Sequence, residues 1–149
     1  MLIGIIATIV IPIIVFYEEI DNYNDDNDDS KWIHSGPFSI DREEYLLGHK
    51  IFLVAEGIDE NDKGSIILTR IDDDGSQKLW KKYNFDGAKK SGFNIYFSPA
   101  LDETRNFCTV EELIGNYKII FENSEYEDIE LKIIHRYLPG MESRFEPVC

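Results

Sequence analysis

The chain opens with an unbroken apolar run, and short apolar segments that alternate with polar ones follow it. Residues Met1–Tyr17 read MLIGIIATIVIPIIVFY and include no charged side chain. A bilayer core of about 30 Å requires roughly 20 apolar residues as helix, with about 17 as the lower limit. We therefore predict that residues 1–17 form one transmembrane anchor. The side chains expected to contact lipid or neighbouring membrane helices are Leu2, Ile3, Gly4, Ile5, Ile6, Ala7, Ile9, Val10, Ile13 and Ile14.

Two other interpretations of this run are a cleaved signal peptide and a buried helix of a soluble domain. A signal peptide requires Lys or Arg before the apolar run and a small-residue cleavage site after it. Neither feature is present, because Glu18 and Glu19 follow Tyr17 directly. The anchor interpretation is therefore favoured. The positive-inside rule, which assigns orientation from Lys and Arg near a membrane helix, cannot be applied here because the first basic residue is Lys31.

An acidic stretch separates the apolar run from the rest of the chain, and we assign residues 18–35 to a linker. Residues Glu18–Ser30 read EEIDNYNDDNDDS, with seven acidic side chains and no basic one. Like charges without apolar periodicity favour an extended spacer. The alternative is a calcium site, since carboxylates are hard oxygen ligands. The EF-hand pattern fails, because it requires Gly at the sixth and Glu at the twelfth position. The candidate calcium ligands are Asp25, Asp26, Asp28 and Asp29.

Beyond the linker, alternation with period two predicts β-strands. Phe93, Ile95 and Phe97 alternate with polar or half-polar neighbours, which is typical of a strand buried on one face. Turn sequences such as Asp74-Gly75 separate the runs. We predict an all-β domain over residues 36–149, an antiparallel sandwich of about seven strands. The strands are expected at residues 38–41, 51–55, 66–68, 78–85, 93–98, 117–122 and 129–135.

One short helix is predicted at Val110–Ile114. Thr109 can cap it, Glu112 follows at the capping-box spacing, and Gly115 can end it. No run of ten or more residues after the first 17 has helical period, so alternating strands and helices are not expected.

Composition and charge exclude some classes of binding partner. The chain is 43% hydrophobic and 13% aromatic, enough to bury the core of one domain. The net charge of −14 argues against nucleic acid, whose binding depends on basic contacts to phosphate. It also argues against a polybasic membrane-surface patch.

Two segments resemble a known family. Residues Pro37–Asp41 followed by Tyr45–Ile51 look like the opening "extended strand, Tyr-x-x-Gly, next strand" of immunoglobulin-like domains on archaeal cell-surface proteins. Residues Leu113–Ile119 are similar to the entry into a late strand of those domains, and the layout is also like macroglobulin-type sandwiches. The resemblance covers about residues 36 to 135. It implies an immunoglobulin-like fold and a location in the cell envelope, and it implies no activity.

The chain contains two cysteines, Cys108 and Cys149. An even number in a domain outside a membrane predicts one disulfide, worth about 3.5–4 kcal/mol by chain entropy. This interpretation places the N-terminus inside the cell and the C-terminal domain outside. The alternative is two reduced thiols in a cytoplasmic domain, which would invert the topology.

The sequence shows no catalytic signature: we find no phosphate-binding glycine loop, no nucleophile elbow and no zinc-binding helix motif. We therefore expect a protein that is not an enzyme and has no cofactor. His49, Cys108, His135 and Met141 supply the ligand types of a blue-copper site. The spacing argues against copper, because a full strand pair separates Cys108 from His135, and a Cys108 ligand would break the disulfide.

Four lysines, Lys81, Lys82, Lys89 and Lys90, form the basic clusters of the chain and flank Tyr83, Phe85 and Phe93. Lysines on an edge strand commonly block edge-to-edge pairing of sheets. The alternative is a docking edge for an acidic partner, or for the Glu18–Ser30 segment of another copy.

Three functions compete at this point. The leading hypothesis is a non-catalytic, single-pass membrane protein whose outer domain is a binding or structural subunit of a larger membrane or envelope complex. Gly4 and Ala7 offer a small-residue face for helix association, so a homo-oligomer is compatible. The second is a membrane-displayed accessory protein that binds copper or calcium or has a redox role. The third is a pilin-like filament subunit.

Overall fold

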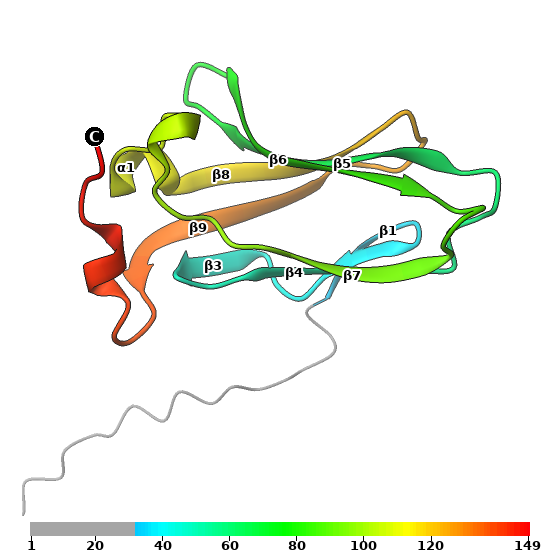
Figure 1. The fold of residues 1–149 in the computed structure, drawn as a ribbon, viewed down its shortest axis with the longest axis horizontal. Helices are drawn as coiled ribbons and strands as arrows, with labels where there is room; N and C mark the ends of the chain where they lie inside the picture. Colours follow the sequence, from blue (N-terminus) through cyan, green and yellow to red (C-terminus); the bar gives the residue numbers. More distant parts are fainter. Residues whose placement is uncertain (1–31) are drawn as a thin grey trace, which may run out of the picture.

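A computed structural model of the chain describes residues 32–149. The described part is a β-sandwich of two sheets with few helical turns (Figure 1). The all-β prediction is therefore confirmed. Within residues 32–149, no helix has the length and apolarity needed to cross a bilayer. The predicted anchor (1–17) and calcium ligands (25–29) lie outside the described residues, as does most of the predicted linker, and they stay predictions.

The first sheet has four antiparallel strands in the order β1-β2-β4-β7. Its inner positions are mostly apolar and its outer positions are mostly polar or aromatic, as alternation predicts. Phe38, Leu53 and Ile95, for example, lie on inner positions, while Ser39 and Asn94 lie on outer ones. The strands are β1 (Ile33–Ser35), β2 (Phe38–Ile40), β4 (Ile51–Glu56) and β7 (Gly92–Phe97).

The second sheet has five strands in the order β3-β9-β8-β5-β6. Its strands are β3 (Glu44–Leu47), β9 (Ile129–Tyr137), β8 (Gly115–Glu122), β5 (Lys63–Ile71) and β6 (Gln77–Asp86). β3 pairs in parallel with β9, so the prediction of a purely antiparallel sandwich was wrong for this pair. The chain passes from β2 in one sheet to β3 in the other through residues 41–43. β3 consequently pairs with the last strand of the domain and not with its own neighbour in sequence.

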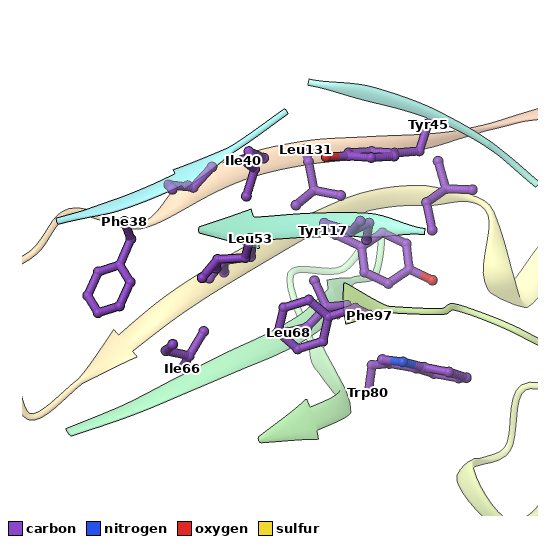
Figure 2. Packing of buried hydrophobic residues seen from close by; sticks show 14 of the residues in the cluster. Phe38, Ile40, Tyr45, Leu53, Ile66, Leu68, Trp80, Phe97, Tyr117 and Leu131 are labelled. Atoms are coloured by element: carbon purple, nitrogen blue, oxygen red, sulfur yellow. The ribbon is translucent and has the colours of Figure 1, made fainter. Parts of the chain in front are cut away.

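The core lies between the two sheets (Figure 2). Phe38 of β2 has no exposed surface, and its ring centroid is 4.5 Å from that of Phe121 in β8 and 5.2 Å from that of Phe85 in β6. These ring contacts join the four-stranded sheet to the five-stranded one. Other side chains with 0% exposure are Ile40, Ile51, Leu53, Ile66, Leu68, Phe97, Phe107, Leu113 and Ile119.

The helix α1 (Val110–Leu113) forms where the sequence predicts it. The Glu112 carboxylate accepts hydrogen bonds from the backbone N–H groups of Cys108 at 2.5 Å and Thr109 at 3.1 Å. These two bonds to the charged form lower the pKa of Glu112. Two short 3₁₀ helices, η2 (Glu103–Arg105) and η3 (Glu142–Phe145), complete the described elements.

A buried hydrogen bond ties α1 to the strand that follows it. The hydroxyl of Tyr117, near the start of β8, donates to the carbonyl oxygen of Leu113 at 2.5 Å. Tyr117 is 1% exposed, and burial raises the pKa of its hydroxyl. The bond therefore fixes the angle at which the chain enters β8.

Replacing Tyr117 with Phe removes this hydroxyl and leaves a buried carbonyl without it. We expect the free energy of unfolding to fall by about 1–3 kcal/mol. Urea unfolding of the full chain in mild detergent, followed by the fluorescence of buried Trp80, measures the change. The matched control is Tyr96→Phe, since Tyr96 is 54% exposed and its ring lies on the outer face. Equal midpoints for the two variants would contradict the assignment.

Candidate binding cleft between two sheet edges

β6 and β7 are consecutive in the chain, and each is the last strand of its sheet. Residues 87–91 connect them and carry the chain from one sheet to the other. A cleft of about 710 Å³ lies where the two edges meet, and residues of both strands and of this connection line it. The cleft therefore lies along an open side of the sandwich, where both strands have an unpaired backbone edge.

Aromatic and aliphatic side chains make up the apolar part of the cleft: Tyr83, Phe85, Phe93 and Ile95. The pairing of Tyr83 with Ile66 directs Tyr83 toward the space between the sheets. Its ring packs against Phe97 with a centroid distance of 5.6 Å. Phe85 is only 5% exposed and contacts Phe38, so the floor of the cleft continues into the core.

Hydrogen bonds fix the connection 87–91. The backbone N–H groups of Lys89 and Lys90 both donate to the carbonyl oxygen of Asp86 at 3.0 Å, and the N–H of Gly87 donates to the carbonyl oxygen of Asp62 at 2.8 Å. A Cβ atom on Gly87 would lie 1.8 Å from the carbonyl oxygen of Asp59, so glycine is required by close backbone approach. The two lysines thus project from an ordered loop.

The cleft is positively charged at its rim. Lys63, Lys89 and Lys90 line it together with a single carboxylate, Asp86. The Nζ atoms of Lys63 and Lys89 lie 3.7 and 3.8 Å from an oxygen of Asp86, and both lysine side chains are largely exposed, so these pairs contribute little to stability. Within residues 32–149, Lys90 has no ion-pair partner.

The structure brings together three of the four lysines predicted from the sequence. Lys89 and Lys90 line the cleft, and the Nζ of Lys81 lies 5.0 Å from the centre of the Tyr83 ring. Lys82 does not line the cleft. It follows Lys81 in the strand, so it points to the opposite face of the sheet, where its Nζ lies 2.6 Å from Oε2 of Glu122. Alternation along a strand explains the separation of the two neighbours.

Sequence reasoning missed Lys63, which lies opposite Asp86 in the β5–β6 pairing. The sequence did contain a signal for this pairing, because the Asp74-Gly75 turn predicts a hairpin of the two strands that flank it. Counting outward from the turn places the first residues of β5 beside the last residues of β6. A bulge at Leu68/Thr69 shifts this register, so the count alone would have been displaced.

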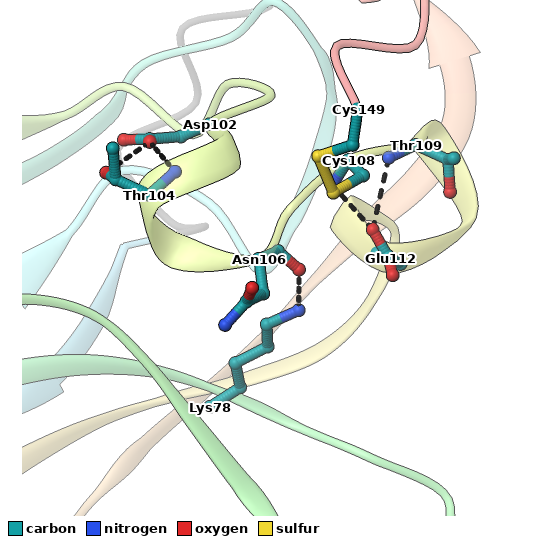
Figure 3. The surroundings of a disulfide bond; sticks show 8 residues. All are labelled: Lys78, Asp102, Thr104, Asn106, Cys108, Thr109, Glu112 and Cys149. Carbon is teal, nitrogen blue, oxygen red and sulfur yellow. Dashed lines mark hydrogen bonds between the residues drawn. A yellow bond between two sulfur atoms is a disulfide. The ribbon is translucent and has the colours of Figure 1, made fainter.

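The predicted disulfide is present: Cys108 is bonded to Cys149, with a Cα–Cα distance of 5.2 Å (Figure 3). The sulfur of Cys108 is thereby used in a covalent bond. His49 Nδ1 accepts a hydrogen bond from the N–H of Leu46 at 2.9 Å, and His135 packs its ring near Tyr137. In the described part of the chain, no group of three or more His, Cys, Asp or Glu side chains could hold a metal ion.

The chain was compared with protein-family models, with curated proteins and with solved structures. None of the three comparisons found a match.

Proposed function

We propose that this chain is a non-catalytic membrane protein whose β-sandwich is a binding subunit of a larger membrane or envelope assembly. The β6/β7 cleft is its docking surface for an acidic polypeptide. The observation that carries the proposal is the composition of the cleft: four lysines, counting Lys81 beside it, surround an aromatic floor in a chain of net charge −14.

The immunoglobulin-like assignment is part of this proposal. The order β9-β8-β5-β6 corresponds to the G-F-C-C′ order of a variable-type immunoglobulin sheet, and β2-β4-β7 corresponds to A-B-E. The Tyr117 hydroxyl bonded to Leu113 resembles the tyrosine corner of such sandwiches. The disulfide differs, because it joins Cys108 to the C-terminal residue and does not bridge the two sheets between B and F. Domains of this kind commonly bind and do not catalyse, although the fold alone fixes no role.

The chemistry of the cleft supports recognition of an extended acidic segment. A free strand edge offers backbone donors and acceptors to an added strand. The lysines supply charge to carboxylates, and the exposed faces of Tyr83 and Phe93 supply apolar contact.

The predicted anchor and the disulfide support the location. Residues 1–17 would hold the domain at a membrane, and a disulfide persists in an oxidising compartment. The N-terminus would then be inside and the sandwich outside the cell membrane.

Purification of the full chain from its native membrane in mild detergent tests the proposal. We expect a bound acidic partner chain, and we expect Lys89→Glu/Lys90→Glu to reduce its recovery at least tenfold. Recovery should also fall as salt is raised, because the lysines are exposed. The control is Lys50→Glu/Lys132→Glu, which makes the same change of charge at exposed sites outside the cleft. A chain that runs alone at monomer mass, or equal recovery with both variants, would refute the proposal.

A further inference from the structure

We infer that the occupant of the cleft is the acidic segment Glu18–Ser30 of a second copy of this chain. This inference rests on the proposed function, since it assumes that the cleft is a docking surface, and it names the partner. It makes the protein self-associating through two different surfaces, one acidic and one basic.

Charge complementarity is the first argument. The segment holds seven carboxylates and no basic side chain. Lys63, Lys89 and Lys90 line the cleft with Asp86 as its single carboxylate. Lys81 lies at its margin, where Lys82 and Glu122 pair with each other. An acidic chain has few surfaces that attract a run of carboxylates, and like charge over the rest of the molecule repels such a run. The segment is therefore directed to the cleft.

The length of the segment also matches the free edge of β6. β6 has ten residues and pairs only with β5, so no strand pairs with its other edge. Added as a strand, the thirteen residues Glu18–Ser30 would extend about 43 Å, compared with about 33 Å for β6. The segment can therefore cover the free edge. Its two large apolar side chains, Ile20 and Tyr23, suit contact with the aromatic floor.

The place where the described chain begins favours the segment of a second copy over the chain's own segment. The described chain enters at Trp32 beside β1, and β1 and β7 are at opposite ends of the four-stranded sheet. A segment returning to its own cleft must cross about 14 Å of sheet, which uses about five residues. Asp28 and Asp29 would be among those residues and so would lie away from the lysines. A second copy can present the whole segment.

Such a contact is heterologous, because the segment of one copy meets the cleft of the next. An open assembly leaves a free segment at one end and a free cleft at the other, so copies add until a ring closes, and the smallest such ring is a dimer in which two copies exchange segments. The contact needs no change in the folded domain.

Zero-length carbodiimide cross-linking of the full chain in mild detergent tests this contact, using a mixture of ¹⁴N-labelled and ¹⁵N-labelled protein. The reagent joins a lysine amine to a carboxylate that touches it. We expect peptides that link Lys81, Lys89 or Lys90 to residues 18–29, with one isotope on each side. Lys89→Glu/Lys90→Glu removes two of these amines, so the cross-link from Lys81 is the measured quantity: its yield should fall at least fivefold, and Lys50→Glu/Lys132→Glu should leave it unchanged. Cross-links within one isotope only, or equal linking of Lys50 and Lys132, would overturn the inference.

A complementation experiment uses the head-to-tail geometry. One variant has a disabled cleft (Lys89→Glu/Lys90→Glu), and the other has a disabled segment, with all four aspartates of residues 25–29 changed to Asn. Mixing them restores one intact contact, so the mixture should form a one-to-one dimer to an extent at least fivefold greater than either variant alone. A mixture that associates no more than the separate variants would overturn the inference.

The two proposals can fail separately. Cross-links from the cleft lysines to a different protein would support the docking function and overturn the self-association. An absence of any cross-link from those lysines, together with no partner that depends on them, would overturn both.

Discussion

Replacing Phe38 with Ala is expected to lower the free energy of unfolding by about 3–5 kcal/mol. Phe38 has no exposed surface, and its ring contacts Phe121, Phe85 and Tyr126 at centroid distances of 4.5, 5.2 and 5.5 Å. These partners belong to the other sheet or to the loop beside it, so the substitution opens a cavity between the layers. Urea unfolding of the full chain in mild detergent gives the change in midpoint and slope.

Phe52→Ala is the matched control for this prediction. Phe52 also stacks on an aromatic ring, that of Tyr96 at 4.7 Å, but both side chains lie on the outer face of the four-stranded sheet. Its removal leaves no enclosed cavity, and a loss of about 1 kcal/mol or less is expected. If Phe38→Ala fails to fold, Phe38→Leu can be measured in its place, and we expect a smaller but measurable loss in the free energy of unfolding. Equal losses at positions 38 and 52 would show that the core is not centred on Phe38.

The strands of the domain could be predicted where one face is buried and the other is exposed. Tyr117, Ile119 and Phe121 alternate in the sequence and are at most 3% exposed in β8. Two short strands were missed. β1 spans three residues with exposed His34 at its centre, and β3 lies in residues 44–47, where no strand was predicted. Their existence depends on partners far along the chain, β2 for one and β9 for the other, which local alternation does not report.

The candidate site was accessible from the sequence only in part. The lysines and aromatics of residues 81–93 were found because they are close together in the chain. Lys82 could not be separated from Lys81 until the strand was known, since the two point to opposite faces. Lys63 and Asn123 reach the cleft through pairing of β5 with β6 and β8, which is a long-range property of the fold.

The C-terminal tail, residues 139–149, is held by more than the disulfide. In the structure, Phe145 is 6% exposed and packs against Tyr137 with a centroid distance of 5.7 Å. The N–H of Val148 also donates to the carbonyl oxygen of Cys108 at 3.0 Å. The tail is therefore docked by packing and hydrogen bonding as well as by the covalent bond.

Replacing both Cys108 and Cys149 with Ser is expected to lower the free energy of unfolding by about 3.5–4 kcal/mol, mainly because the unfolded chain gains conformational freedom. The folded tail should stay in place, since Phe145 still packs in the core. Urea unfolding measures the global loss, and hydrogen exchange of the Val148 amide reports the tail. Phe145→Ala with the disulfide intact is the counterpart: it should loosen residues 142–148 through loss of packing while the covalent bond remains. If the double Ser variant releases the tail without denaturant, the disulfide acts in the folded state and not chiefly through the unfolded one.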